Sequence, residues 1–155
     1  MRLNRIVLAL ASMAPIGAAQ CTVTGATFEP YGTGCGAVVS QAPTLKGAFD
    51  STTCTVSLTV DAFGGCCSTF VTYRLLGLGL APDKTPLPFL GSGCELLIQP
   101  LIVVALPPNQ DTLKLTIPPG MPTGTVYLQG GAGYLTTIGL TRDLALTQGL
   151  RVTLL

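Results

Sequence analysis

The position of the cysteines constrains this chain more than any other feature. All six cysteines of the 155 residues follow residue 20, behind a segment with the pattern of a secretory signal. That segment starts with the basic residues Arg2 and Arg5 and continues with an apolar stretch over Ile6–Gly17. Small residues then end at Ala19, where a signal peptidase could cut. We therefore predict a signal peptide over residues 1–19 and export to the periplasm, the cell surface or the medium.

Export to an oxidising compartment decides how the thiols are interpreted. An even number of exported thiols predicts a disulfide framework, and not metal ligands or nucleophiles. The six are Cys21, Cys35, Cys54, Cys66, Cys67 and Cys94. The adjacent Cys66 and Cys67 lack the two-residue gap of thioredoxin-like and zinc-binding motifs. The apolar signal stretch is shorter than the roughly 20 residues that cross a bilayer, so we predict no membrane span after signal removal.

Composition points to strands and tight turns. Hydrophobic residues make up 48% of the chain and charged residues 10%, and there are 19 glycines and 12 prolines. No stretch after the signal keeps the 3.6-residue period of an amphipathic helix. We predict one all-β domain over residues 20–155, an antiparallel β-sandwich with an immunoglobulin-like or jelly-roll layout. The order of the strands does not follow from the sequence.

Alternation of apolar and polar residues marks the expected strands. In Thr55–Val60 the apolar residues Val56, Leu58 and Val60 would face a core. The other expected strands are Pro43–Phe49, Thr69–Leu76, Cys94–Gln99, Leu101–Leu106, Thr112–Ile117, Thr125–Gln129 and Leu150–Leu154. The hydrophobic run Pro86–Leu106 therefore predicts two buried strands and no transmembrane helix. Gln20–Gly25 is expected as an added edge strand or as a tail tied down by Cys21.

Glycines and prolines between these strands predict turns. The expected turns are Gly64-Gly65, Pro82-Asp83, Gly91-Ser92-Gly93, Pro107-Pro108-Asn109 and Pro118-Pro119-Gly120. No helix signal follows Gly77 and Gly79 or Gly130 and Gly131, so these glycines predict strand ends or bulges and no phosphate-binding loop.

Six segments of the chain form a pattern of glycines, cysteines and strands. They are Tyr31-Gly32-Thr33-Gly34-Cys35, the strand entry Pro43-Thr44-Leu45, Leu87-Pro88-Phe89-Leu90-Gly91-Ser92-Gly93-Cys94, Thr112–Pro118, Gly124–Gln129 and Gln148–Thr153. Through these segments the chain resembles a small secreted module of planctomycete-type bacteria, from about Phe28 to the C-terminus. That module usually ends larger exported proteins, and no activity is assigned to it. The resemblance implies a β-sandwich and a bridge between Cys35 and Cys94.

Four further cysteines remain once that implied bridge is set aside. A bridge between the neighbours Cys66 and Cys67 would be strained. Two pairings stay open, which are Cys21–Cys66 with Cys54–Cys67, and Cys21–Cys67 with Cys54–Cys66.

Missing residue types exclude several function classes. Without histidine, Ser-His-Asp and Cys-His mechanisms and histidine-based metal sites are unavailable, and we predict no enzyme, no cofactor and no metal. The full chain has eight Lys and Arg, six once Arg2 and Arg5 are removed, against seven Asp and Glu. These charges are scattered singly, so no basic patch for nucleic acid is present.

Two groups of residues keep alternatives open. A hydrolase would need two carboxylates to converge, from among Glu29, Asp50, Asp61, Asp83, Glu95, Asp111 and Asp143. A glycan-binding module would need exposed aromatic faces, and without tryptophan the residues we expect at the surface are Tyr31, Phe63, Tyr127 and Tyr134.

The first hypothesis is a non-catalytic extracellular or cell-surface structural module. A sandwich with few charges to guard its edge strands is predisposed to associate with itself or with another surface protein. The second hypothesis is a glycan- or ligand-binding module, and the third is a carboxylate-dependent hydrolase.

Overall fold

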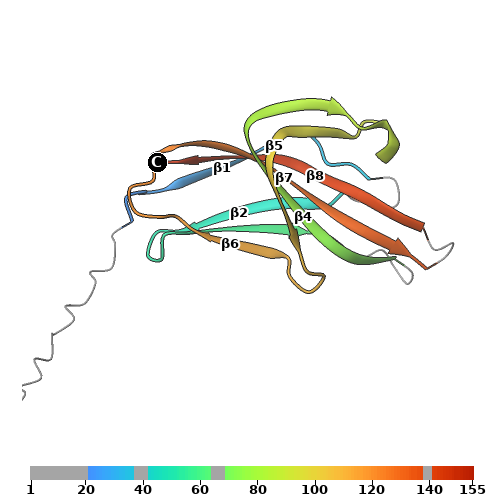
Figure 1. The fold of residues 1–155 in the computed structure, drawn as a ribbon, viewed down its shortest axis with the longest axis horizontal. Coiled ribbons are helices and arrows are strands. Elements are labelled where there is room, and N and C mark those ends of the chain that lie inside the picture. The colour runs from blue at the N-terminus through green and yellow to red at the C-terminus, as the bar shows by residue number, and fades with distance from the viewer. Residues whose placement is uncertain (1–20, 37–41, 64–68, 138–140) are drawn as a thin grey trace, which may run out of the picture.

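The described residues fold into two antiparallel sheets packed face to face (Figure 1). The computed structural model describes residues 21–36, 42–63, 69–137 and 141–155. The elements in chain order are β1 (Ala26–Tyr31), β2 (Thr44–Asp50), β3 (Thr55–Asp61), β4 (Thr69–Pro86), the 3-10 turn η1 (Pro88–Leu90), β5 (Glu95–Leu106), β6 (Thr112–Thr116), β7 (Gly124–Thr136) and β8 (Thr141–Leu154). One sheet has five strands in the order β1-β8-β7-β4-β5, and the other has three in the order β2-β3-β6. The predicted all-β antiparallel sandwich is confirmed.

The core lies between the sheets and follows the alternation expected for β3. Val56, Leu58 and Val60 of β3 are 7%, 1% and 0% exposed. They belong to one hydrophobic cluster with residues of the large sheet, among them Leu128 of β7 and Val152 of β8. The β3 pattern therefore predicted both the strand and its buried face.

Several strands are longer than the sequence predicted. The expected strands Cys94–Gln99 and Leu101–Leu106 form one strand, β5, because Pro100 lies in an edge strand where its missing N–H is tolerated. The expected turn at Pro82-Asp83 is wrong, because β4 continues through it with a bulge on either side of Pro82. Turns do lie at the three other described positions, which are Gly91-Ser92-Gly93, Pro107-Pro108-Asn109 and Pro118-Pro119-Gly120, while Gly64-Gly65 lies outside the described residues.

The N-terminal end of the described chain runs along the C-terminal strand. Residues 21–25 form no strand, but the Thr24 N–H donates to the Leu155 carbonyl over 2.8 Å. The Leu155 N–H in turn donates to the Gly25 carbonyl. Of the two expected forms of this segment, an edge strand or a tail tied down by Cys21, the structure shows the tail. The strand that follows it, β1, was not predicted.

The far half of the β4–β5 hairpin bends over the outer face of the large sheet (Figure 1). Bulges flank Gly79, where a Cβ would collide with the Gln99 carbonyl of β5. A Cβ on Gly77 would meet the Ile98 side chain at 2.9 Å. Gly79 therefore lies at bulges, as predicted, whereas Gly77 lies in regular register. Both glycines also allow close strand approach, and bulges with glycines let a hairpin bend.

A buried glutamine holds the bent hairpin to the sheet. Gln129 of β7 is 4% exposed, and its Oε1 accepts from the Leu97 N–H over 2.8 Å. Its Nε2 donates to the carbonyls of Glu95 and Thr147, both at 3.1 Å. The bulge between Gln129 and Gly131 lies beside this network.

Two disulfides lie at opposite parts of the sandwich in the described ranges. Cys35 and Cys94 are joined with a Cα–Cα distance of 5.2 Å, and this is the pair that the resemblance implies. The bridge links the segment after β1 to the bent hairpin. The second bridge joins Cys21 to Cys54, with a Cα–Cα distance of 5.4 Å.

The Cys21–Cys54 bridge differs from both pairings that the sequence left open. Cys54 directly precedes β3, at the end of the sandwich where the tail after residue 20 lies. Thr22 Oγ1, next to Cys21, accepts from the Gly120 N–H of the β6–β7 loop, and the Ile117 N–H donates to the Cys54 carbonyl. Contacts at this end therefore bring Cys21 to Cys54, which cysteine counting could not anticipate. Cys66 and Cys67 lie outside the described residues.

Candidate interaction surface

The two sheets differ in width, and this leaves one side of the sandwich open. Among the described strands, β5 pairs only with β4 and forms an edge of the five-stranded sheet. The three-stranded sheet ends at β6, which pairs with β3 alone among the strands that the structure describes. We call the side between β5 and β6 the open side.

β5 presents bare apolar side chains on this side. Leu101, Ile102 and Val103 are 65%, 58% and 59% exposed. Ile102 pairs with Leu78 and Val103 with Gly77, so successive residues point to opposite faces of the sheet. The prediction that Leu101–Leu106 would be buried is wrong for these three residues and for Ala105, because β5 is the end strand of its sheet.

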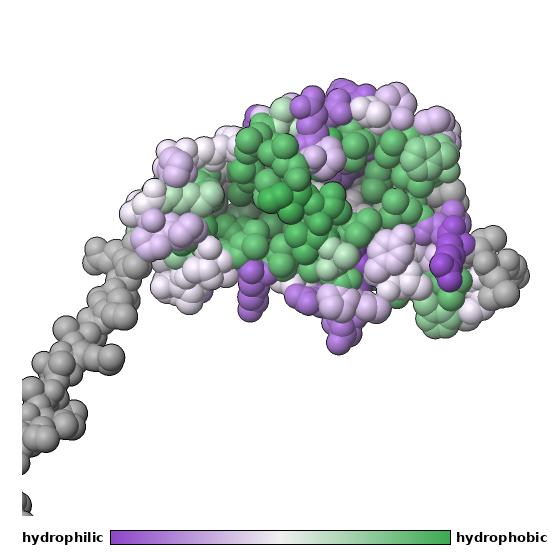
Figure 2. Space-filling view, in the orientation of Figure 1, coloured by the Kyte–Doolittle hydropathy of each residue, from purple (hydrophilic) through white to green (hydrophobic). Residues whose placement is uncertain are grey.

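An apolar groove continues the open side between the sheets. It has a volume of about 190 Å³, and residues from both sheets line it, including Leu58, Leu78, Leu115, Val126 and Leu128. Met121, 41% exposed, lies at its margin. Figure 2 shows hydrophobic side chains gathered across the middle of this face, over the region where Figure 1 places β4 and β5.

The open side carries almost no charge along its hairpin. No Asp, Glu, Lys or Arg occurs between Leu96 and Gln110, or between Leu75 and Pro82 of the partner strand β4. Exposed apolar surfaces of this kind are common at interaction sites.

A second feature is a cleft beside two of the four predicted aromatic residues, Tyr31 and Tyr127. The rings of Tyr31 and Tyr127 meet edge to face, with their centroids 5.9 Å apart. The cleft has a volume of about 290 Å³, and the ion pair between Arg151 and Glu29 also lines it. Tyr31 itself is a packing residue, since its hydroxyl donates to the Leu97 carbonyl over 2.8 Å and its ring covers Gly149. Burial and the neighbouring Tyr127 raise the pKa of Tyr31 to about 12.

The other two predicted aromatic residues lie elsewhere. Tyr134 is 2% exposed and packs with Ala132 and Ala145, so its expected exposure is wrong. Its position on β7, a strand with neighbours on both sides, explains this burial. Burial raises the pKa of Tyr134. Phe63 is 65% exposed but does not line the tyrosine cleft.

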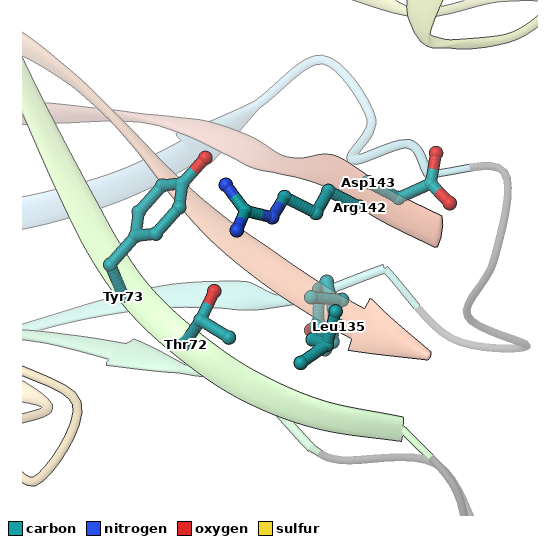
Figure 3. A pocket seen from close by; sticks show the side chains of 6 residues that line it. Thr72, Tyr73, Leu135, Arg142 and Asp143 are labelled. Carbon is teal, nitrogen blue, oxygen red and sulfur yellow. The ribbon is translucent and has the colours of Figure 1, made fainter. Parts of the chain in front are cut away.

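A third feature is a polar pocket on the large sheet, which the candidates Tyr134 and Asp143 help to line. The sequence did not predict that these residues would meet Tyr73 and Arg142. Tyr73 of β4 and Arg142 of β8 point toward one another across it, and Asp143 points away (Figure 3). Its volume is about 340 Å³. The Tyr73 ring lies over Gly133, where a Cβ would collide with it. The sequence signal for this contact is the pairing of Tyr73 with Gly133 across two strands. Recognising this pairing requires the register between β4 and β7, which the sequence alone does not show.

The carboxylates are mostly engaged by local partners. Glu29 pairs with Arg151, and Asp61 accepts from Lys46 over 2.8 Å. Asp83 accepts from the Lys84 N–H and Asp111 from the Thr112 hydroxyl.

Asp50 is the most strongly perturbed of the carboxylates. It accepts from both Thr52 and Thr53 in the β2–β3 turn, and these hydrogen bonds lower its pKa to about 2. Such partners suit turn and surface roles.

Comparisons with known proteins add no assignment. Models of known protein families, curated proteins and solved structures all give no match to this chain. Within the described ranges, no group of three or more Cys, Asp or Glu side chains is placed to hold a metal ion. Nor does any helix in that part of the chain have the length and apolar character needed to cross a membrane.

Proposed function

We propose that this chain is an exported, non-catalytic structural or interaction module that works outside the cell or at the cell surface. The observation that carries the proposal is the open side, where Leu101, Ile102 and Val103 are all more than half exposed on an edge strand. Monomeric soluble proteins rarely leave a large contiguous apolar surface without a partner. The disulfides and the signal-like start of the sequence support the exported location.

The chemistry of the described surface favours contact over turnover. Four of the seven carboxylates have a local hydrogen-bond or ion-pair partner that occupies them in the folded chain, and a fifth, Asp50, stabilises a turn. The polar pocket offers one guanidinium and a few hydroxyl groups and lacks a pair of facing carboxylates. The apolar surface is thus the feature best matched to a function.

Cell fractionation of the source organism tests this proposal. The mature protein should remain with the cell envelope without any added small ligand, and it should be released by detergent, which competes for apolar surfaces. Recovery of the protein as a free species in the medium, together with saturable saccharide binding, would reverse the proposal.

The tyrosine cleft favours a glycan-binding module as the second candidate. Tyr127 is only half-buried, and the ion pair of Glu29 and Arg151 supplies polar groups beside it. An aromatic ring next to charged groups suits a sugar, which has both apolar faces and hydroxyls. In a glycan array, this candidate requires a saturable signal that Tyr127→Ala abolishes and that Phe63→Ala, an exposed aromatic outside the cleft, leaves unchanged.

A further inference from the structure

We propose that the open side binds a second copy of this chain, through antiparallel pairing of β5 with β5 of the other copy. This inference rests on the proposed function and names the partner. The two five-stranded sheets would then join into one continuous sheet across a twofold axis near Leu101–Val103. Such an interface is isologous, because each copy contributes the same strand.

The free edge of β5 supplies the hydrogen-bonding groups for this pairing. Backbone N–H and C=O groups alternate along a strand between its two neighbours, so about half of those in β5 point away from β4. An edge of this kind is a template for another strand. Pro100 removes one donor at the start of the exposed stretch, and Leu101–Leu106 continues without proline.

The side chains of β5 have the pattern of a strand buried on both faces. Leu101 through Leu106 is an uninterrupted apolar run, which is typical of a central strand. In the single chain, however, Leu101, Ile102 and Val103 are exposed on both faces of the sheet. Pairing with a second β5 would place this strand in the middle of a sheet, where its sequence suits it.

The other three edge strands carry charges that oppose such pairing. β1 contains Glu29, β2 contains Lys46 and Asp50, and β6 contains Lys114. Charged residues on edge strands are a common means of preventing association. β5 beyond Glu95 is the edge strand without one, so the absence of charge singles it out.

Charge also favours a second copy over an unrelated partner. A twofold axis sets β5 against its own sequence, so any charge near the axis would face a like charge. The stretch from Leu96 to Gln110 contains none. The mature chain as a whole has six basic and seven acidic residues once Arg2 and Arg5 are removed, so two copies repel each other only weakly.

The test measures the mass of the oxidised mature protein by light scattering across a concentration series. We expect the wild type to double in mass, and Ile102→Lys to raise the dimer dissociation constant by about tenfold or more, because two lysines would meet at the axis. Val103→Lys, which projects from the other face, should act in the same way. Phe89→Lys is the matched control, because Phe89 is 78% exposed on η1 and outside β5.

At protein concentrations where the wild type is monomeric, equal urea midpoints for all variants establish that the lysines have not unfolded the domain. Both lysine sites are more than half exposed in the single chain, so the folded monomer should accept them. Hydrogen exchange then locates the contact. The amides of residues 101–106 should become protected as the wild-type concentration rises, and those of β1 should not.

Three results would overturn β5 pairing. They are a wild type that stays monomeric at every concentration, a dimer that the lysines in β5 leave intact, and protection of groove-lining β6 without protection of β5. Each leaves the proposed function standing if the protein is still retained in the envelope, since another partner then covers the open side. Free protein in the medium that binds a saccharide saturably would instead count against the proposed function itself.

Discussion

At the scale of single residues, the Gln129 side chain forms hydrogen bonds with backbone groups that would otherwise pair with a neighbouring strand. Its side chain accepts from the Leu97 N–H and donates to two carbonyls, so three backbone groups depend on one buried amide. A buried donor left without a partner costs about 1–3 kcal/mol. The bent hairpin is therefore fixed by hydrogen bonds as well as by the Cys35–Cys94 bridge.

Gln129→Ala should lower the free energy of unfolding by about 1–3 kcal/mol, because the Leu97 N–H would lose its partner. Equilibrium urea unfolding of the oxidised protein measures the change. Gln110→Ala is the control, since Gln110 is exposed and donates a single hydrogen bond to the Thr112 carbonyl. Equal effects of the two substitutions would show that the buried network adds no stability.

The β2–β3 turn should have a measurable pH signature at Asp50. Hydrogen bonds from Thr52 and Thr53 lower the pKa of this carboxyl from 3.8 to about 2. Because the folded pKa is the lower one, the stabilisation is fully present above pH 3.8 and is lost as the pH falls through about 2. NMR titration of the Asp50 carboxyl should give the depressed pKa, and Thr53→Val should move it upward. A pKa near 3.8 in the wild type would contradict the turn geometry.

At the scale of elements, the β4–β5 hairpin bends because Gly79 carries no side chain. A Cβ at this position would collide with the Gln99 carbonyl of the paired strand. Gly79→Ala should therefore destabilise the fold by about 1–3 kcal/mol, through strain or displacement of β5. Thermal or urea unfolding measures this effect.

Gly124→Ala is the matched control for that substitution. Gly124 lies at the start of β7, and a Cβ there would meet no atom within 4 Å. This variant should be neutral or slightly stabilising, because alanine restricts the unfolded chain more than glycine does. If Gly79→Ala were as benign as Gly124→Ala, the close approach of β4 and β5 would be wrong.

The Cys21–Cys54 bridge is open to direct chemical test. Peptide mapping without reduction should recover a fragment that joins these two cysteines. The bridge closes a sequence separation of 33 residues, so replacing both cysteines with serine should cost about 4 kcal/mol in the chain-entropy model. Recovery of Cys21 joined to Cys66 or Cys67 would contradict the structure and restore one of the pairings that the sequence left open.

The sequence predicted strands where period-two alternation is strong and failed where long-range contacts decide. Val56, Leu58 and Val60 predicted β3 and its buried face without help from other strands. The extent of β4 was not predicted, because Pro82 looks like a turn residue and only its pairing with Ile98 of β5 keeps it in a strand.

The candidate site was only partly predictable for the same reason. The tyrosines were named, but the meeting of Tyr31 with Tyr127 depends on the β1–β8–β7 order. The apolar run of β5 was recognised, while its exposure follows from the small sheet having only three strands. Strand order arises from contacts between distant residues, and local sequence patterns do not encode it.

At the scale of the whole molecule, the unequal width of the sheets is the feature that connects fold to function. Five strands against three leave an apolar edge and groove on one side, and the edge strands elsewhere carry charges. The bent hairpin and its disulfide cover part of the outer face of the large sheet, beside the tyrosine cleft. The open side is the uncovered apolar surface on which the proposed association rests.

The most direct measurement is the molar mass of the oxidised mature protein by light scattering, over a wide concentration series and without added ligand. An association surface on the open side predicts a mass that rises with concentration and falls back to that of one chain when mild detergent covers the apolar patch. A mass equal to one chain at every concentration, unchanged by detergent, would contradict association between copies through the open side.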